Sequence, residues 1–154
     1  MRLVIRLGAV ALVCLASGGA GLAEATPAKL FACAIGANEV SVTAAGGRLV
    51  YHYGTADKEQ MTIVGIPASG NIFQLTQRFA GMEYQLRFKN GEYSYIVYSS
   101  EGNARSGASA TSGLVVMRGT KTISDKACAP LAELAMPGDL LKGVPEDSDK
   151  YSAL

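Results

Sequence analysis

Apolar and polar residues alternate with a period of two along most of the chain from residue 30 onward. This period is typical of half-buried strands, and no long segment has the helical spacing of about 3.6 residues. Gly46-Gly47, Pro67 and similar breaks separate the alternating segments and indicate short turns. The pattern predicts about eight antiparallel strands, at residues 30–35, 39–43, 48–53, 61–66, 72–79, 83–89, 92–98 and 114–117.

The most regular part of this pattern is a predicted hairpin over residues 82–100. Asn90-Gly91 lies at its centre and favours a two-residue type I′ turn, in which both central residues have a positive φ. Such a turn would place Phe88 opposite Tyr93, with both rings on one face. The other face is a candidate contact surface, formed by Gln85, Arg87, Ile96 and Tyr98.

Cys33 and Cys128 lie near opposite ends of the strand region, and we expect one disulfide between them in an oxidising compartment. About eight short strands can form a sandwich or close into a barrel, and a bridge from the first strand to the end of the last favours the barrel. Pro130 suits the first position of a short C-terminal helix, with Leu131 and Leu134 one turn apart. The expected fold is therefore all-β, a single antiparallel barrel or sandwich with one disulfide and a short helix.

The N-terminus has the three regions of a secretion signal peptide. Arg2 and Arg6 form the charged region, residues 7–16 are apolar, and residues 18–23 are mostly small. The apolar run is shorter than the roughly 20 residues of a membrane-spanning helix, so we expect a periplasmic or secreted mature chain with no membrane span. The expected parts are a signal peptide at residues 1–23, an all-β domain at residues 24–135 and a flexible acidic tail at residues 136–154.

Charge and motifs argue against nucleic-acid binding and catalysis. The chain has a net charge of +1, becomes slightly acidic without its leader, and has no cluster of Lys and Arg. His52, the only histidine, lies in a predicted strand, and the residues around Ser109 lack the final glycine of a nucleophile elbow. No phosphate-binding loop or zinc-ligand spacing occurs. We therefore expect no enzyme activity, no metal and no cofactor.

Small and polar residues dominate residues 99–112, a loop longer than a hairpin needs. An arginine on such a loop can reach a carboxylate in a partner's cleft and bind it through two hydrogen bonds. A flexible surface loop without a partner is the alternative. The candidate binding residues are Arg105, Ser106, Ser109, Thr111 and, beyond the next strand, Lys121.

Together these features resemble the small periplasmic inhibitors of C-type lysozyme. The shared features are a leader, a cysteine on the first strand, a cysteine after the last strand, an eight-stranded antiparallel body and a late Ser/Gly/Ala loop, here Ser106-Gly107-Ala108-Ser109-Ala110. The resemblance is one of architecture, and unlike most of that family this chain has no tryptophan. It implies that the loop enters a lysozyme cleft, where a serine and a cation, Arg105 or Lys121, meet the catalytic acids.

The sequence thus predicts an exported, non-catalytic binding protein that inhibits or neutralises an envelope-targeted hydrolase such as lysozyme through this loop. A structural or accessory envelope protein that docks to a larger periplasmic assembly is the alternative. A carrier of a small apolar ligand is less favoured, because aromatic side chains are expected to fill the interior of a small barrel.

Overall fold

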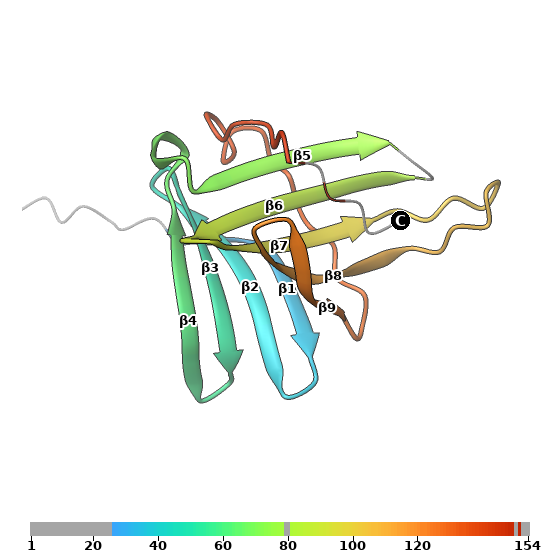
Figure 1. Ribbon diagram of the computed structural model, residues 1–154, viewed down its shortest axis with the longest axis horizontal. Helices are drawn as coiled ribbons and strands as arrows, with labels where there is room; N and C mark the ends of the chain where they lie inside the picture. The colour runs from blue at the N-terminus through green and yellow to red at the C-terminus, as the bar shows by residue number, and fades with distance from the viewer. Residues whose placement is uncertain (1–25, 79–80, 150, 152–154) are drawn as a thin grey trace, which may run out of the picture.

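The computed structural model describes residues 26–78, 81–149 and 151, which form two antiparallel sheets (Figure 1). The predicted signal peptide and the predicted strand end at residue 79 lie outside these residues. Each sheet is a meander, ordered β1-β2-β3-β4 and β5-β6-β7-β8-β9. The strands are β1 (Ala28–Ile35), β2 (Asn38–Ala45), β3 (Arg48–Thr55), β4 (Lys58–Gly65), β5 (Ile72–Arg78), β6 (Met82–Asn90), β7 (Tyr93–Ser100), β8 (Thr111–Arg118) and β9 (Lys121–Ala127), and a 3₁₀ turn, η1 (Pro67–Ser69), leads from one sheet to the other. The all-β prediction is confirmed, with nine strands in the described part of the chain.

The core lies between the facing surfaces of the two sheets, whose strands cross at a steep angle in Figure 1. Gly65 lies where the sheets approach closely, because a Cβ there would be 2.9 Å from the Cβ of Ile72. No β-ladder joins the two sheets within the described residues, so the closed barrel favoured by the sequence is not found. Large inward-facing side chains come from both sheets: Phe31, Val40, Val42, Leu49, Tyr51, Ile72, Leu86, Phe88 and Val97.

The hairpin of β6 and β7 forms, but its pairing differs from the prediction by two residues. Asn90 pairs with Tyr93 and Phe88 with Tyr95, so the two-residue loop is Gly91-Glu92. Gly91 has a φ of +61°, and no described residue other than glycine has a positive φ. A glycine at the first central position is typical of a type II′ turn, whereas the type I′ turn at Asn90-Gly91 would need a positive φ at Asn90. A shift of two residues preserves the faces, so the prediction of which side chains point inward still holds.

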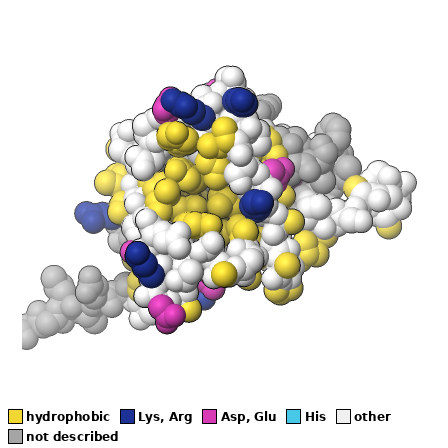
Figure 2. All heavy atoms as spheres, turned by 60° about the horizontal axis from the view of Figure 1, so that its bottom comes forward, with side chains coloured by type: hydrophobic (Ala, Val, Ile, Leu, Met, Phe, Trp, Pro, Cys, Tyr) yellow, Lys and Arg dark blue, Asp and Glu magenta, His cyan; other side chains and the backbone are white. Residues whose placement is uncertain are grey.

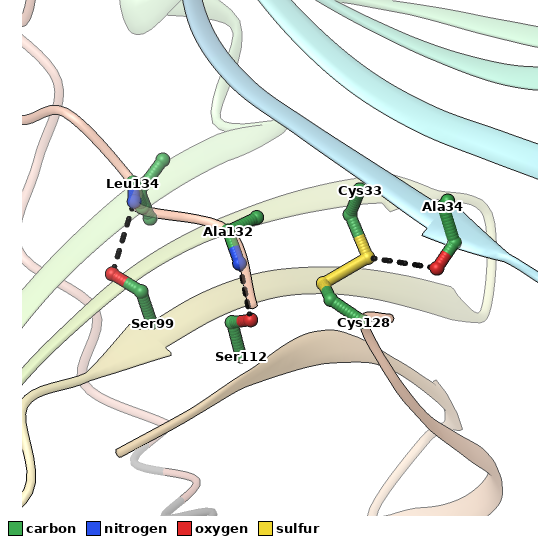
Figure 3. Close-up of a disulfide and its surroundings, with 7 residues drawn as sticks. All are labelled: Cys33, Ala34, Ser99, Ser112, Cys128, Ala132 and Leu134. Carbon is green, nitrogen blue, oxygen red and sulfur yellow. Dashed lines mark hydrogen bonds between the residues drawn. A yellow bond between two sulfur atoms is a disulfide. The ribbon is translucent and has the colours of Figure 1, made fainter. Parts of the chain in front are cut away.

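The predicted disulfide between Cys33 and Cys128 is present (Figure 3). Cys33 lies on β1 and Cys128 directly after β9, with Cα atoms 5.3 Å apart. The bond therefore links the first sheet to the second, across 95 residues of sequence.

The predicted helix at Pro130 is wrong, because the chain after Cys128 is extended along the edge of β1. The Ala129 N–H donates to Ala34 O at 3.1 Å, and the Ala135 N–H donates to Leu30 O at 2.9 Å. Between them, two further N–H groups donate to buried serine hydroxyls of the second sheet, as Figure 3 shows: Ala132 N to Ser112 Oγ at 2.8 Å and Leu134 N to Ser99 Oγ at 3.0 Å. These contacts satisfy the backbone without a helix.

The predicted flexible acidic tail at residues 136–154 contains a buried residue, Asp147, which is 4% exposed. Residues 145–147 pair with the edge of β5, where Gln74 N donates to Pro145 O and Asp147 N donates to Gln74 O. Asp147 accepts a 2.5 Å hydrogen bond from Arg87 Nε, and both side chains are almost fully buried. The hairpin face proposed from the sequence as a contact surface is therefore covered: Gln85, Arg87, Ile96 and Tyr98 are each at most 4% exposed.

Candidate functional site

Three of the predicted binding residues, Arg105, Ser106 and Ser109, lie on the loop between β7 and β8. This loop extends beyond the sheet in Figure 1. Asn103 tightens it, since its backbone N–H donates to Ala108 O at 2.8 Å and its Oδ1 accepts from Arg105 N at 2.9 Å. All three predicted side chains are exposed.

The other two predicted residues lie outside this loop. Thr111 begins β8, and Lys121 pairs with Arg118 at the opposite end of that strand. Seven residues of extended chain separate these ends, or about 24 Å. The five predicted residues therefore do not form one site, and Lys121 cannot assist Arg105 on the loop.

A pocket of about 480 Å³, which the sequence analysis did not predict, opens between the two sheets near the turn from β1 to β2. Figure 2 brings the lower side of Figure 1 forward and shows hydrophobic side chains gathered in the middle of this face, with charged side chains around them. Both sheets contribute to the lining: Ile35, Gly36, Asn38, Tyr51, Tyr53, Met61, Tyr95, Leu114, Val116, Ser124 and Lys126.

Aromatic rings from both sheets meet at the pocket. The ring of Tyr51 lies 5.6 Å from that of Phe88 and 5.5 Å from that of Tyr95, measured between centroids. These tilted contacts are favourable for aromatic pairs. Tyr51 on β3 and Tyr95 on β7 both line the pocket, and the lining continues from Tyr95 across the second sheet to Val116 on β8 and Ser124 on β9.

Six of the lining residues carry a polar side-chain group, and Tyr51 is the most deeply buried of them. Its side chain is 1% exposed, and its hydroxyl forms no hydrogen bond with any described residue. Burial raises the pKa of the Tyr51 hydroxyl, and the neighbouring phenols of Tyr95 and Tyr53 raise it further. The hydroxyl therefore stays protonated and is available as a hydrogen-bond donor.

Lys126 is the only charged residue that lines this pocket among the residues described. It lies on β9, is exposed, and takes part in none of the described ion pairs. Its ammonium group places a positive charge beside an opening that is otherwise uncharged among the described residues.

A second, polar depression on the outer face of the first sheet contains His52 and Glu59. His52 Nδ1 lies within hydrogen-bond distance of Glu59 Oε1, and the hydrogen bond from His52 lowers the pKa of Glu59. Ser41 lies opposite His52 on β2, but no hydrogen bond joins their side chains. The pair ties β3 to β4 on an exposed surface.

The residues that the structure describes contain no group of three or more His, Cys, Asp or Glu side chains placed to hold a metal ion. None of their helical segments is long and apolar enough to cross a membrane. No protein-family model, no curated protein sequence and no solved structure matches this chain.

Proposed function

We propose that this chain is an exported, non-catalytic binding protein that holds a small, mainly apolar ligand between the two layers of a sandwich-like fold. The observation that carries the proposal is the pocket of about 480 Å³. Small-molecule sites commonly have such volumes, with an apolar and aromatic lining and a few polar groups. The disulfide supports export, because such bonds persist in oxidising compartments.

Filling the pocket tests this proposal. Val116→Phe places a larger side chain in the lining, and it is expected to weaken binding of the neutral fluorophore N-phenyl-1-naphthylamine by about tenfold or more. The measurement is a fluorescence titration of the purified, disulfide-bonded protein. Val64→Phe makes the same change at an exposed position outside the pocket and is expected to bind like the unmodified protein. Equal binding by a folded Val116→Phe variant would refute the pocket as the site.

The projecting loop favours a second candidate function, the inhibition of an envelope-targeted hydrolase such as lysozyme. Arg105 is exposed on a loop that is tightened by its own hydrogen bonds and extends away from the sheet. A guanidinium group in that place can enter a cleft and bind a carboxylate through two hydrogen bonds.

For this candidate, we expect the purified protein to slow cell-wall hydrolysis by a C-type lysozyme, and Arg105→Ala to raise the inhibition constant by about tenfold. Arg48→Ala, at the exposed turn between β2 and β3, is the matched control and is expected to inhibit normally. Activity that the unmodified protein leaves unchanged would exclude lysozyme as the target. Equal potency of the Arg105→Ala variant would exclude the loop mechanism.

A further inference from the structure

We infer that the ligand of the intersheet pocket is an organic acid with an apolar body, such as a medium-chain fatty acid or an aromatic carboxylate. This inference rests on the proposed function and adds the chemical class of the ligand. It follows from the polar groups of the pocket, because the described lining residues supply hydrogen-bond donors and one cation but no carboxylate.

The first of these groups is the hydroxyl of Tyr51. Tyr51 lines the pocket, and its hydroxyl forms no hydrogen bond with a described residue. The hydroxyl is accessible from the pocket, since it is not one of the buried side-chain atoms that lack a partner. A ligand oxygen can therefore accept a hydrogen bond from it.

The second and third groups are Asn38 and Lys126. Asn38 Oδ1 accepts a 3.3 Å hydrogen bond from Gln60 Nε2, whereas its amide N–H groups donate to no described residue. Among the described residues that line the pocket, Lys126 supplies the only charge and none is an Asp or Glu. A carboxylate would therefore find donors and a cation here, whereas an ammonium group would find no acidic partner.

The remaining lining is suited to an apolar body. Ile35, Met61, Leu114 and Val116 present aliphatic or thioether groups, and the rings of Tyr51 and Tyr95, tilted by 44° to each other, add aromatic surface. A hydrocarbon chain or an aromatic ring gains free energy from leaving water for such a surface.

Three probes share an eight-carbon chain and differ in the charge of the head group: octanoate, octan-1-ol and octylammonium. Comparing them distinguishes the contribution of the charge to binding from that of the apolar chain. Each is titrated against the disulfide-bonded protein at low salt by competition with N-phenyl-1-naphthylamine. We expect octanoate to bind about fivefold more tightly than octan-1-ol, with octylammonium weakest, and the preference to shrink as salt is raised.

Charge reversal at the pocket mouth provides the sharpest test. Lys126→Glu is expected to fold normally, because the side chain is exposed, and to make octylammonium bind more tightly than octanoate. Lys142→Glu, an exposed lysine outside the pocket, is the matched control and is expected to keep the original order. A Lys126→Glu variant that still prefers octanoate would overturn the inference.

Tyr51→Phe removes only the hydroxyl oxygen. We expect octanoate to bind this variant about threefold to tenfold more weakly, while the neutral fluorophore binds as before. Unchanged octanoate affinity would remove Tyr51 from the recognition of the acid.

The outcomes distinguish the inference from the proposed function. Equal binding of the three probes would overturn the carboxylate assignment and leave the pocket as a neutral apolar site. A failure of all the probes and of the fluorophore to bind would refute both proposals. If sedimentation instead shows a dimer that octanoate does not dissociate, a second copy of the chain occupies the pocket and the inference is wrong.

Discussion

Replacing Cys33 with serine is expected to lower the free energy of unfolding by about 4 kcal/mol. The bond closes a long loop, because its cysteines are 95 residues apart, and it removes much of the conformational freedom of the unfolded chain. Its loss also uncouples β1 from the end of β9 in the native state. Guanidinium denaturation, followed by the circular dichroism of the sheets, measures the change.

The control for this prediction is the comparison of single and double variants. Cys33→Ser, Cys128→Ser and the double variant are all expected to lose nearly the same stability, since each lacks the same bond. A single variant as stable as the unmodified protein would show that the bond contributes little. Additive losses would show that the cysteines act through packing instead.

Asp147→Asn is expected to destabilise the protein by about 3 kcal/mol, because it leaves the guanidinium of Arg87 buried without its charged partner. The side chains of the pair are only 5% and 4% exposed, and the Arg87 Nε to Asp147 Oδ2 distance is 2.5 Å. Arg87 Nη2 also donates to the backbone carbonyl of Asp149, so the ion pair holds the end of the chain against β6. Urea denaturation of the variant and the unmodified protein measures the loss.

The exposed ion pair of Arg118 with Glu92 is the matched control. Its N···O distance is 2.9 Å, but its side chains are 58% and 56% exposed, so Glu92→Gln is expected to change stability too little to resolve. The double replacement Arg87→Met with Asp147→Leu is expected to be more stable than Asp147→Asn, because it removes both buried charges. A loss for Glu92→Gln equal to that for Asp147→Asn would contradict the role of burial.

The fold class could be predicted because the alternation of side chains follows directly from strand geometry. This alternation identified which side chains of the hairpin face inward. The identification holds even though the turn lies at Gly91-Glu92, which shifts the strand pairing by two residues from the predicted one. β9 was difficult to define as a strand because it is an exposed edge, where residues such as Lys121 and Ile123 need not alternate in polarity. The extended course after Pro130 depends on β1 and on two serine hydroxyls distant in sequence, and no local pattern contains that information.

Less of the candidate site could be predicted from the sequence. Composition located the loop that carries Arg105, but it could not show that Lys121 lies at the far end of β8. Alternation indicates that Tyr51 and Tyr95 face inward, and such rings are expected from the sequence to fill the interior. Whether rings fill a space or leave a pocket depends on how the two sheets cross, which pairwise strand patterns do not specify.

The course of residues 129–147 has a consequence for synthesis. This stretch supplies backbone partners to the outer edges of β1 and β5, one in each sheet. Until it leaves the ribosome, both edges present unpaired amide and carbonyl groups that can template the addition of a foreign strand. A chain truncated before residue 129 would retain that hazard permanently, so residues 129–147 protect the edges of β1 and β5 from aggregation.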